Sequence, residues 1–165
     1  MYQDPIITEY LNLIKASNGE IIEYHQGDPI SVPAIGLPCC IISKRDTQVA
    51  ALTNAEDEQA IGLSLTVIVD VRKELSTEES RSKVSGEVAK LYDIIEGRDT
   101  DLTLKDTSVL GILRHNPLVN STYGLRTDLG TITRVDYGTT FRDRGREAWT
   151  IEARVDFTAH FSQVR

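Results

Sequence analysis

A strict alternation of apolar and polar side chains near the end of the chain constrains its fold more than any other feature. The apolar positions are Trp149, Ile151, Ala153, Val155, Phe157, Ala159 and Phe161. Polar residues occupy the positions between them, through Ser162. Because successive side chains of a strand point to opposite faces, this pattern predicts a strand with one apolar and one polar face. Such strands are typical of antiparallel sheets whose helices cover a single face.

Further strands are predicted upstream of this segment. Six residues on one face mark the clearest of them: Ile61, Leu63, Leu65, Val67, Val69 and Val71. Ile68 is apolar but falls on the opposite face. Shorter apolar runs predict three separate strands at residues 20–25, 39–45 and 47–54. Residues 131–141 are expected to pair with the last strand as a hairpin that turns near Gly145.

Three helices are predicted from apolar spacing and capping signals. Asp4 and Pro5 begin the first, and Gly19 ends it. An apolar stripe predicts a second helix that ends before Gly97, and a short third helix is expected between Asp106 and Pro117. Residues 97–107 and 117–130 are expected to be long loops. The chain therefore reads as one α+β domain, residues 1–165, with a mainly antiparallel sheet and about three helices packed on one face.

The charge balance narrows the range of functions. The 165 residues carry a formal net charge of −7. A free-standing protein that reads DNA sequence more often carries a basic balance. The first ten residues lack a basic region followed by a long apolar run, and no apolar stretch reaches the length of a membrane span. We therefore expect a protein that is made and used inside a cell, with no membrane partner.

The stretch "YHQGDPISVPAIGLPCC" combines His25 with the vicinal pair Cys39 and Cys40 and resembles a reactive or metal site in composition. Adjacent cysteines rarely ligate one ion together, and nothing in the sequence directs His25 to either sulfur. Motifs for phosphate, dinucleotide or nucleophile-elbow chemistry are missing from the sequence. We therefore predict no catalytic residue, metal or cofactor, and a structural role for the cysteines. A small enzyme that uses Cys39 or Cys40 with His25 remains the alternative.

Two charged segments are candidate contact sites. Arg142, Arg144 and Arg146 lie on the expected hairpin tip, where they could pair with a carboxylate-bearing neighbour or a phosphate backbone. A solvated tip that pairs with its own carboxylates is the alternative. The acidic counterpart would be Asp99, Asp101 and Asp106, in and just after a long loop. Together these six residues are the predicted subunit or tail interface.

Several stretches resemble tail terminator proteins of tailed bacteriophages, also called minor tail or neck proteins. The first, "IIEYHQGDPISVPAIGLPCCII", combines an aromatic residue, a Gly-Asp-Pro turn, a proline-bearing loop and an apolar strand. The second joins "LYDIIEGRDTD" to "SVLGILRHN", and the final strand "AWTIEARVDFTAHF" fits the closing hairpin of such proteins. These stretches cover most of the chain, and none of them is a catalytic motif.

The resemblance implies a non-enzymatic virion protein of the tail or neck, assembled in the host cytoplasm. Its subunits would form a homo-oligomeric, hexameric ring that caps the tail tube and stops its polymerisation. The ring would join the tube protein to the head-closure or connector protein, and DNA would pass through its lumen without sequence readout. Another neck component, such as a head-closure or connector-adaptor protein, is the alternative within the same class.

Overall fold

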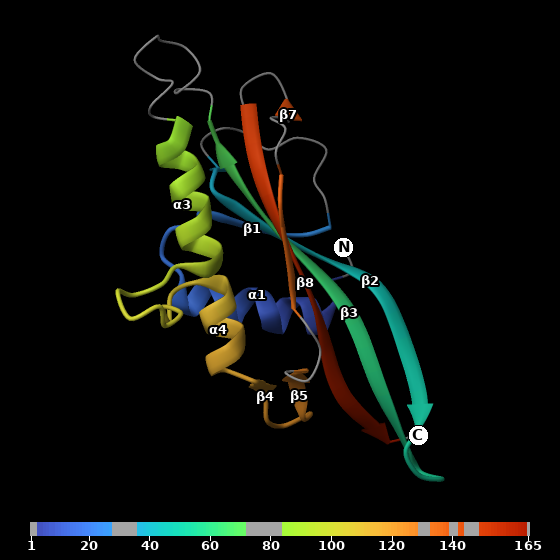
Figure 1. The fold of residues 1–165 in the computed structure, drawn as a ribbon. Helices are drawn as coiled ribbons and strands as arrows, with labels where there is room; N and C mark the ends of the chain where they lie inside the picture. Colours follow the sequence, from blue (N-terminus) through green and yellow to red (C-terminus); the bar gives the residue numbers. More distant parts are fainter. Residues whose placement is uncertain are drawn as a thin grey trace.

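The computed structural model describes residues 3–27, 36–71, 84–128, 133–138, 142–143 and 149–164. Its helices are α1 (Pro5–Ser17), α3 (Val84–Glu96) and α4 (Val109–His115). The first strands are β1 (Glu23–Gln26), β2 (Cys39–Ala51) and β3 (Glu56–Asp70). The later strands are β4 (Leu118–Asn120), β5 (Leu125–Thr127), β6 (Arg134–Tyr137), β7 (Arg142–Asp143) and β8 (Trp149–Val164). Figure 1 shows long, curved strands with the helices grouped on one side.

All of these strands belong to one sheet, in which β8 is central. The main order is β1-β2-β3-β8-β5-β4, and β6 and β7 also pair with β8. β8 runs antiparallel to β3 from Thr150 to Val164. The expectation of antiparallel neighbours is wrong for β1, which pairs with β2 in parallel. The sheet is nevertheless mostly antiparallel, and the predicted α+β class with helices on one face is confirmed.

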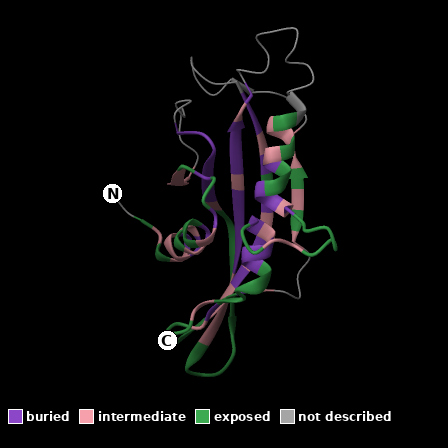
Figure 2. Cartoon of the chain, turned by 90° about the vertical axis from the view of Figure 1, so that its left-hand side faces the viewer, coloured by how far each residue is buried: buried purple, intermediate pink, exposed green. Residues whose placement is uncertain are grey.

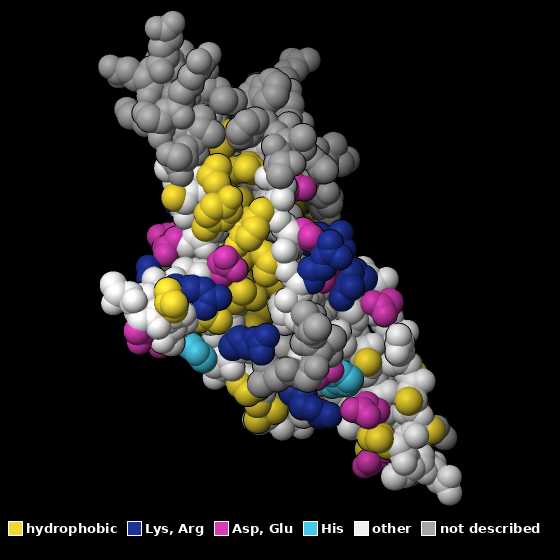
Figure 3. Space-filling model, viewed as in Figure 1, with side chains coloured by type: hydrophobic (Ala, Val, Ile, Leu, Met, Phe, Trp, Pro, Cys, Tyr) yellow, Lys and Arg dark blue, Asp and Glu magenta, His cyan; other side chains and the backbone are white. Residues whose placement is uncertain are grey.

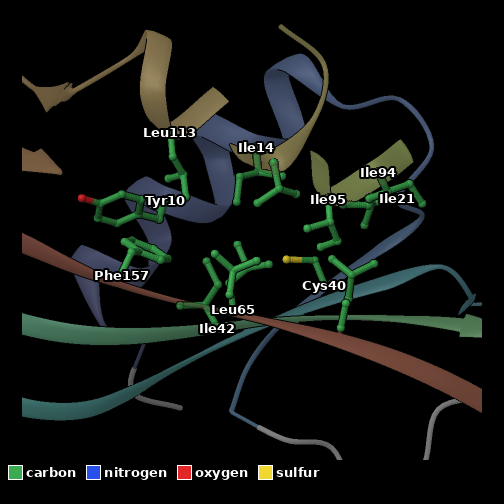
Figure 4. Packing of buried hydrophobic residues seen from close by; sticks show 14 of the residues in the cluster. Tyr10, Ile14, Ile21, Cys40, Ile42, Leu65, Ile94, Ile95, Leu113 and Phe157 are labelled. Carbon is green, nitrogen blue, oxygen red and sulfur yellow. The ribbon is translucent and has the colours of Figure 1, made fainter. Parts of the chain in front are cut away.

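The main core lies between the helices and the alternating faces of the long strands. The predicted apolar face of β3 is buried from Ile61 to Val69, and so are Ile151 to Ala159 of β8 at every second position. Figure 4 shows Tyr10, Ile14, Ile95 and Leu113 pointing down from the helices onto this face. The side chain of Trp149 and the turn at Gly145 lie outside the described part of the chain.

The helix α1 forms where the capping signal predicted it. The Asp4 carboxylate accepts hydrogen bonds from the backbone N–H groups of Ile6 and Ile7. Tyr10 is fully buried, and its ring centroid lies 5.0 Å from that of Phe157. Its hydroxyl lies 2.9 Å from the Thr127 hydroxyl, within hydrogen-bond distance. One side chain therefore joins α1 to two strands of the sheet.

The two strands predicted at 39–45 and 47–54 form a single strand. β2 runs unbroken from Cys39 to Ala51, with a register shift between Lys44 and Asp46 in its pairing with β3. A bulge inserts one extra residue and bends a strand without ending it, so a polar interruption in sequence need not be a turn. The turn lies later, at residues 52–55, before β3 begins at Glu56.

One expectation for the middle of the chain is confirmed and one is wrong. The short third helix lies between Asp106 and Pro117 as expected. Ser108 caps it, because its hydroxyl accepts a hydrogen bond from the backbone N–H of Gly111, and Asp106 pairs with His115. The segment 117–130 is not a structureless loop, because β4 and β5 pair with each other and β5 continues onto β8. The short sequences of β4 and β5 carry no periodic pattern that would predict this strand pairing.

A second apolar cluster lies on the opposite face of the sheet. It contains Leu37, Cys39, Ile41 and Ile68. This cluster explains the apolar exception at Ile68, which is fully buried there. The part of the sheet nearest β1 is thus buried on both faces.

Candidate assembly interface

The structure describes only part of the predicted arginine cluster. The backbone of Arg142 lies on β7 and pairs with Thr150 of β8. Arg144 and Arg146 lie outside the described residues. The hairpin context predicted for Arg142 therefore holds for its backbone, and the side-chain contacts of all three arginines stay a prediction.

The predicted acidic residues lie on the connection between α3 and α4, where each of them makes hydrogen bonds or an ion pair with nearby residues of the same segment or of α4. The Asp101 carboxylate accepts a hydrogen bond from the backbone N–H of Thr103, and this bond lowers the pKa of Asp101. An oxygen of Asp106 lies 2.6 Å from Nδ1 of His115. The backbone of Asp99 bonds to Thr103 and Leu102, which closes a tight turn.

The two predicted halves of the interface are not brought together within one subunit. The connection that carries Asp99, Asp101 and Asp106 follows the end of α3, whereas β7 lies near the start of that helix, at the other end of the sheet (Figure 1). Any pairing between Arg142 and these carboxylates must therefore join two different molecules. This geometry suits a head-to-tail contact, in which one patch meets a different patch on the next subunit.

The cysteine pair is placed for packing. Cys40 is fully buried in the main core, and Cys39 is fully buried in the second cluster on the other face. Both are buried because the sheet carries an apolar cluster on each face here. Burial raises the pKa of the Cys40 thiol, which disfavours the thiolate that nucleophilic chemistry needs. His25 pairs with Glu23, whose carboxylate oxygen lies 3.0 Å from its Nε2.

The most distinctive surface is one that the sequence patterns did not single out. Residues 44–60 and 160–164 form a three-stranded extension of β2, β3 and β8, which we call the arm. It projects past the layer of helices (Figure 1), and Figure 2 shows its far end exposed. Every residue of β2 from Lys44 to Ala51 is exposed. The signal was present in the run "TQVAALT", residues 47–53, which is uncharged and rich in strand-forming residues.

The polar face of the sheet is fixed by ion pairs. Asp156 lies between Arg154, at 2.9 Å, and the Ser64 hydroxyl, which donates to it at 2.9 Å. Burial alone would raise the pKa of Asp156, but these hydrogen bonds lower it below its ordinary value of 3.8. From the bulge in β2, Arg45 donates to the backbone carbonyls of Leu63 and Phe157. The network thus ties three strands together.

A second charged group lies where the arm meets β5. Arg126 reaches Glu58 at 3.2 Å, and the imidazole of His160 lies between Asp128 and Glu58. Positive and negative side chains are interspersed on the face shown in Figure 3, without one large patch of a single sign. A surface of this kind holds its own charges in place and offers no strong general attraction for a polyanion.

A groove lies under the arm on the helix side. Its volume is about 790 Å³, and residues from α1, from the turn after β4 and from β8 line it. The apolar lining residues include Ile6, Tyr123, Leu125, Phe161 and Val164. The charged lining residues are Asp4, Glu9 and Lys44.

Among the described residues no group of three or more His, Cys, Asp or Glu side chains is placed to hold a metal ion. None of the helices within that part of the chain is long and apolar enough to cross a membrane. Comparison with protein-family models gave no match, and comparison with curated proteins gave no significant match.

Proposed function

We propose that this protein is a structural subunit of a bacteriophage tail, of the tail terminator type. Its copies assemble into a ring that caps the tail tube, stops its polymerisation and joins it to the head connector. The observation that carries the proposal is the arm, an exposed three-stranded ribbon whose outer edges are open. Open strand edges pair readily with other chains, so a ribbon of this kind suits a subunit that must be joined on two sides.

Other features support the same function. Both cysteines are buried, one on each face of the sheet, and burial disfavours the thiolate of Cys40, which favours the structural role over a Cys-dependent enzyme. The interspersed charges on the surface shown in Figure 3 suit a protein that DNA passes without being held or read. The order of the ring, hexameric by the family resemblance, is part of the proposal, and so is a place in the virion neck after assembly in the host cytoplasm.

The test is electron microscopy and native mass measurement of the purified protein, alone and with tail tubes. We expect closed rings and one ring at the end of each tube, with tube growth stopped when the protein is added. A ring that binds the head connector but ignores tubes would instead identify a head-closure or connector-adaptor protein. A protein that stays monomeric and binds neither structure would contradict both functions.

A further inference from the structure

One edge of the arm belongs to β2 and is open over most of its length. β1 covers this edge only from Cys39 to Ile42, and no other described strand pairs with it beyond that point. Exposed sheet edges normally carry charges or proline, which discourage pairing with other chains. Residues 47–53 carry neither, and Val49 and Leu52 are 60% and 50% exposed. An uncharged, strand-forming edge of this kind needs a partner strand to cover it.

The backbone of this edge is oriented to accept such a strand. The N–H of Leu52 donates to the carbonyl of Glu56, so this pair is hydrogen-bonded within the hairpin. Hydrogen-bonded and non-hydrogen-bonded pairs alternate along an antiparallel ladder. Ala51 and Val49, which pair with Asp57 and Gln59, therefore direct their N–H and C=O groups away from β3, toward the open edge.

The opposite edge of the arm belongs to β8 and is open as well. β5 covers β8 only at Ala159 and His160, and no other described strand pairs with residues 161–164 on that side. This stretch is uncharged, and Val164 is 71% exposed. It also lines the groove, whose lining combines apolar residues such as Ile6 and Leu125 with the charged residues Asp4, Glu9 and Lys44. The arm therefore presents two uncharged open edges, one of which borders a partly apolar recess.

The two edges lie at the same level along the arm, and their paired side chains point to the same face. Val49 pairs with Gln59, and Gln59 pairs with Phe161, so Val49 and Phe161 lie in one row on the same face of the arm. The next rows join Ala50 to Ser162 through Glu58, and Ala51 to Gln163 through Asp57. β2 and β8 run in the same direction, because each is antiparallel to β3. A rotation about an axis along the arm would thus bring the β2 edge of one copy beside the β8 edge of the next.

We propose that the arm joins copies of this chain by strand pairing. Residues 48–51 of one copy add in parallel to residues 161–164 of the next, and Val49 enters the groove beside Phe161. The inference deepens the proposed function, because it supplies the head-to-tail contact that closes a ring.

A second copy is the occupant that the charges favour. The chain carries a net charge of −7, so contacts between copies are repulsive unless the touching segments are uncharged or neutralised. Both edge segments are uncharged. The strand between them carries Glu56, Asp57 and Glu58, and Glu58 is paired with Arg126. The same molecule provides both halves of the contact, the exposed apolar edge and the recess that accepts it. A closed ring then leaves no open edge in the arm.

The experiment uses two single variants that each destroy one edge. Val49→Lys places a charge on the β2 edge, and Gln163→Lys places one on the β8 edge. Analytical ultracentrifugation of the full chain should show self-association weakened by about tenfold or more in each variant, because charged edge residues oppose strand pairing. Mixed together, the two variants keep one good contact between them, so they should form one-to-one heterodimers and no larger species. Ile22→Lys, at an apolar residue that is 59% exposed and lies outside the arm and the groove, should assemble like the wild type.

A variant that changes the backbone separates loss of strand pairing from loss of folding. Ala51→Pro removes an N–H that faces the open edge and leaves the β2–β3 ladder in place. Its thermal melting should match the wild type while its self-association falls. Rings of wild-type size and affinity in Val49→Lys or Ala51→Pro would overturn the strand-pairing contact and leave the ring function standing. Dimers of Gln163→Lys alone would overturn it in favour of a symmetric β2–β2 contact. A wild-type protein that neither self-associates nor binds tubes would overturn the contact and the proposed function together.

Discussion

At the scale of single residues, the cysteine pair shows how two adjacent side chains of a strand can occupy two different cores. Cys40 packs with Ile42 and Leu65 under the helices (Figure 4), and Cys39 packs with Ile68 on the other face. Each thiol behaves as a small apolar group. We therefore expect substitution of either cysteine to change the stability of the fold.

We therefore predict that Cys40→Ser destabilises the fold without affecting assembly. The new hydroxyl would be fully buried among apolar groups, at a cost of about 1–3 kcal/mol. Cys40→Ala is the matched control, because it also removes the sulfur but adds no polar atom, and it should cost less than the serine variant. Urea denaturation measures both. Equal stability of the serine variant and the wild type would mean that the side chain finds a hydrogen-bond partner there.

A pH dependence is expected from Asp156. Its pKa is lower in the folded protein than in the unfolded chain, so its contribution to stability is present above the ordinary value of 3.8 and is lost as pH falls through the lowered pKa. Asp156→Asn should cost about 1.5–3 kcal/mol at neutral pH, the usual range for hydrogen bonds to charged groups. The gap between the variant and the wild type should shrink as the pH is lowered below 4.

The control for this measurement is Asp136→Asn. Asp136 lies on β6, the strand beside Asp156, and pairs with Arg134 of the same strand, but both side chains are exposed. Exposed ion pairs contribute little, so this variant should stay within about 1 kcal/mol of the wild type. A constant gap between Asp156→Asn and the wild type from pH 7 to pH 2 would show that the Asp156 charge does not stabilise the fold.

At the scale of elements, β8 organises the molecule. It pairs with β3 over its full length on one side and with β5, β6 and β7 on the other. Its apolar face supports α1 through the contact of Phe157 with Tyr10, and its polar face carries Asp156 and His160. The strand therefore serves both as one wall of the core and as part of the exposed arm.

Phe157→Ala should destabilise the domain strongly. The side chain is 2% exposed, and removing a buried phenylalanine costs about 3–5 kcal/mol, a large part of the stability of a typical domain. Thr158→Ala, the next residue on the opposite face, is the control and should have a small effect. Thermal melting distinguishes the two. An unchanged melting temperature for Phe157→Ala would contradict the role of this face as the main wall of the core.

At the scale of the whole molecule, the arginines of the last hairpin remain candidates for a second contact. Arg142, on β7, lies at the other end of the sheet from the acidic connection after α3 (Figure 1), so it is available for a neighbour or a tail protein. Arg144 and Arg146 lie outside the described residues. Losing one partner of a buried arginine–carboxylate pair costs about 3–5 kcal/mol. Changing all three arginines to serine should therefore weaken the ring or its docking on the tube while the monomer stays folded.

Size-exclusion chromatography and tube binding measure this effect. Arg114→Ser, at an exposed position of α4, is the control and should assemble normally. Wild-type assembly and tube binding in the triple variant would show that these arginines make no interface contact and belong to a solvated turn. Because β7, which carries Arg142, lies at the end of the sheet opposite the arm (Figure 1), the triple variant and the edge variants test separate contacts.

The sequence by itself determined the features that depend on local periodicity and capping. The alternation in β3 and β8 identified both core faces, and Asp4 with Pro5 identified the start of α1, because neighbouring residues alone fix these patterns. Only the tertiary structure decided that β2 is one bulged strand, that Cys39 and Ile68 share a second cluster, and that β1 runs parallel to β2. These outcomes depend on which strands lie beside each other. The same holds for the candidate interface. The sequence showed an uncharged run at 47–53, but only the strand order of the folded sheet shows that no described strand pairs with its outer edge.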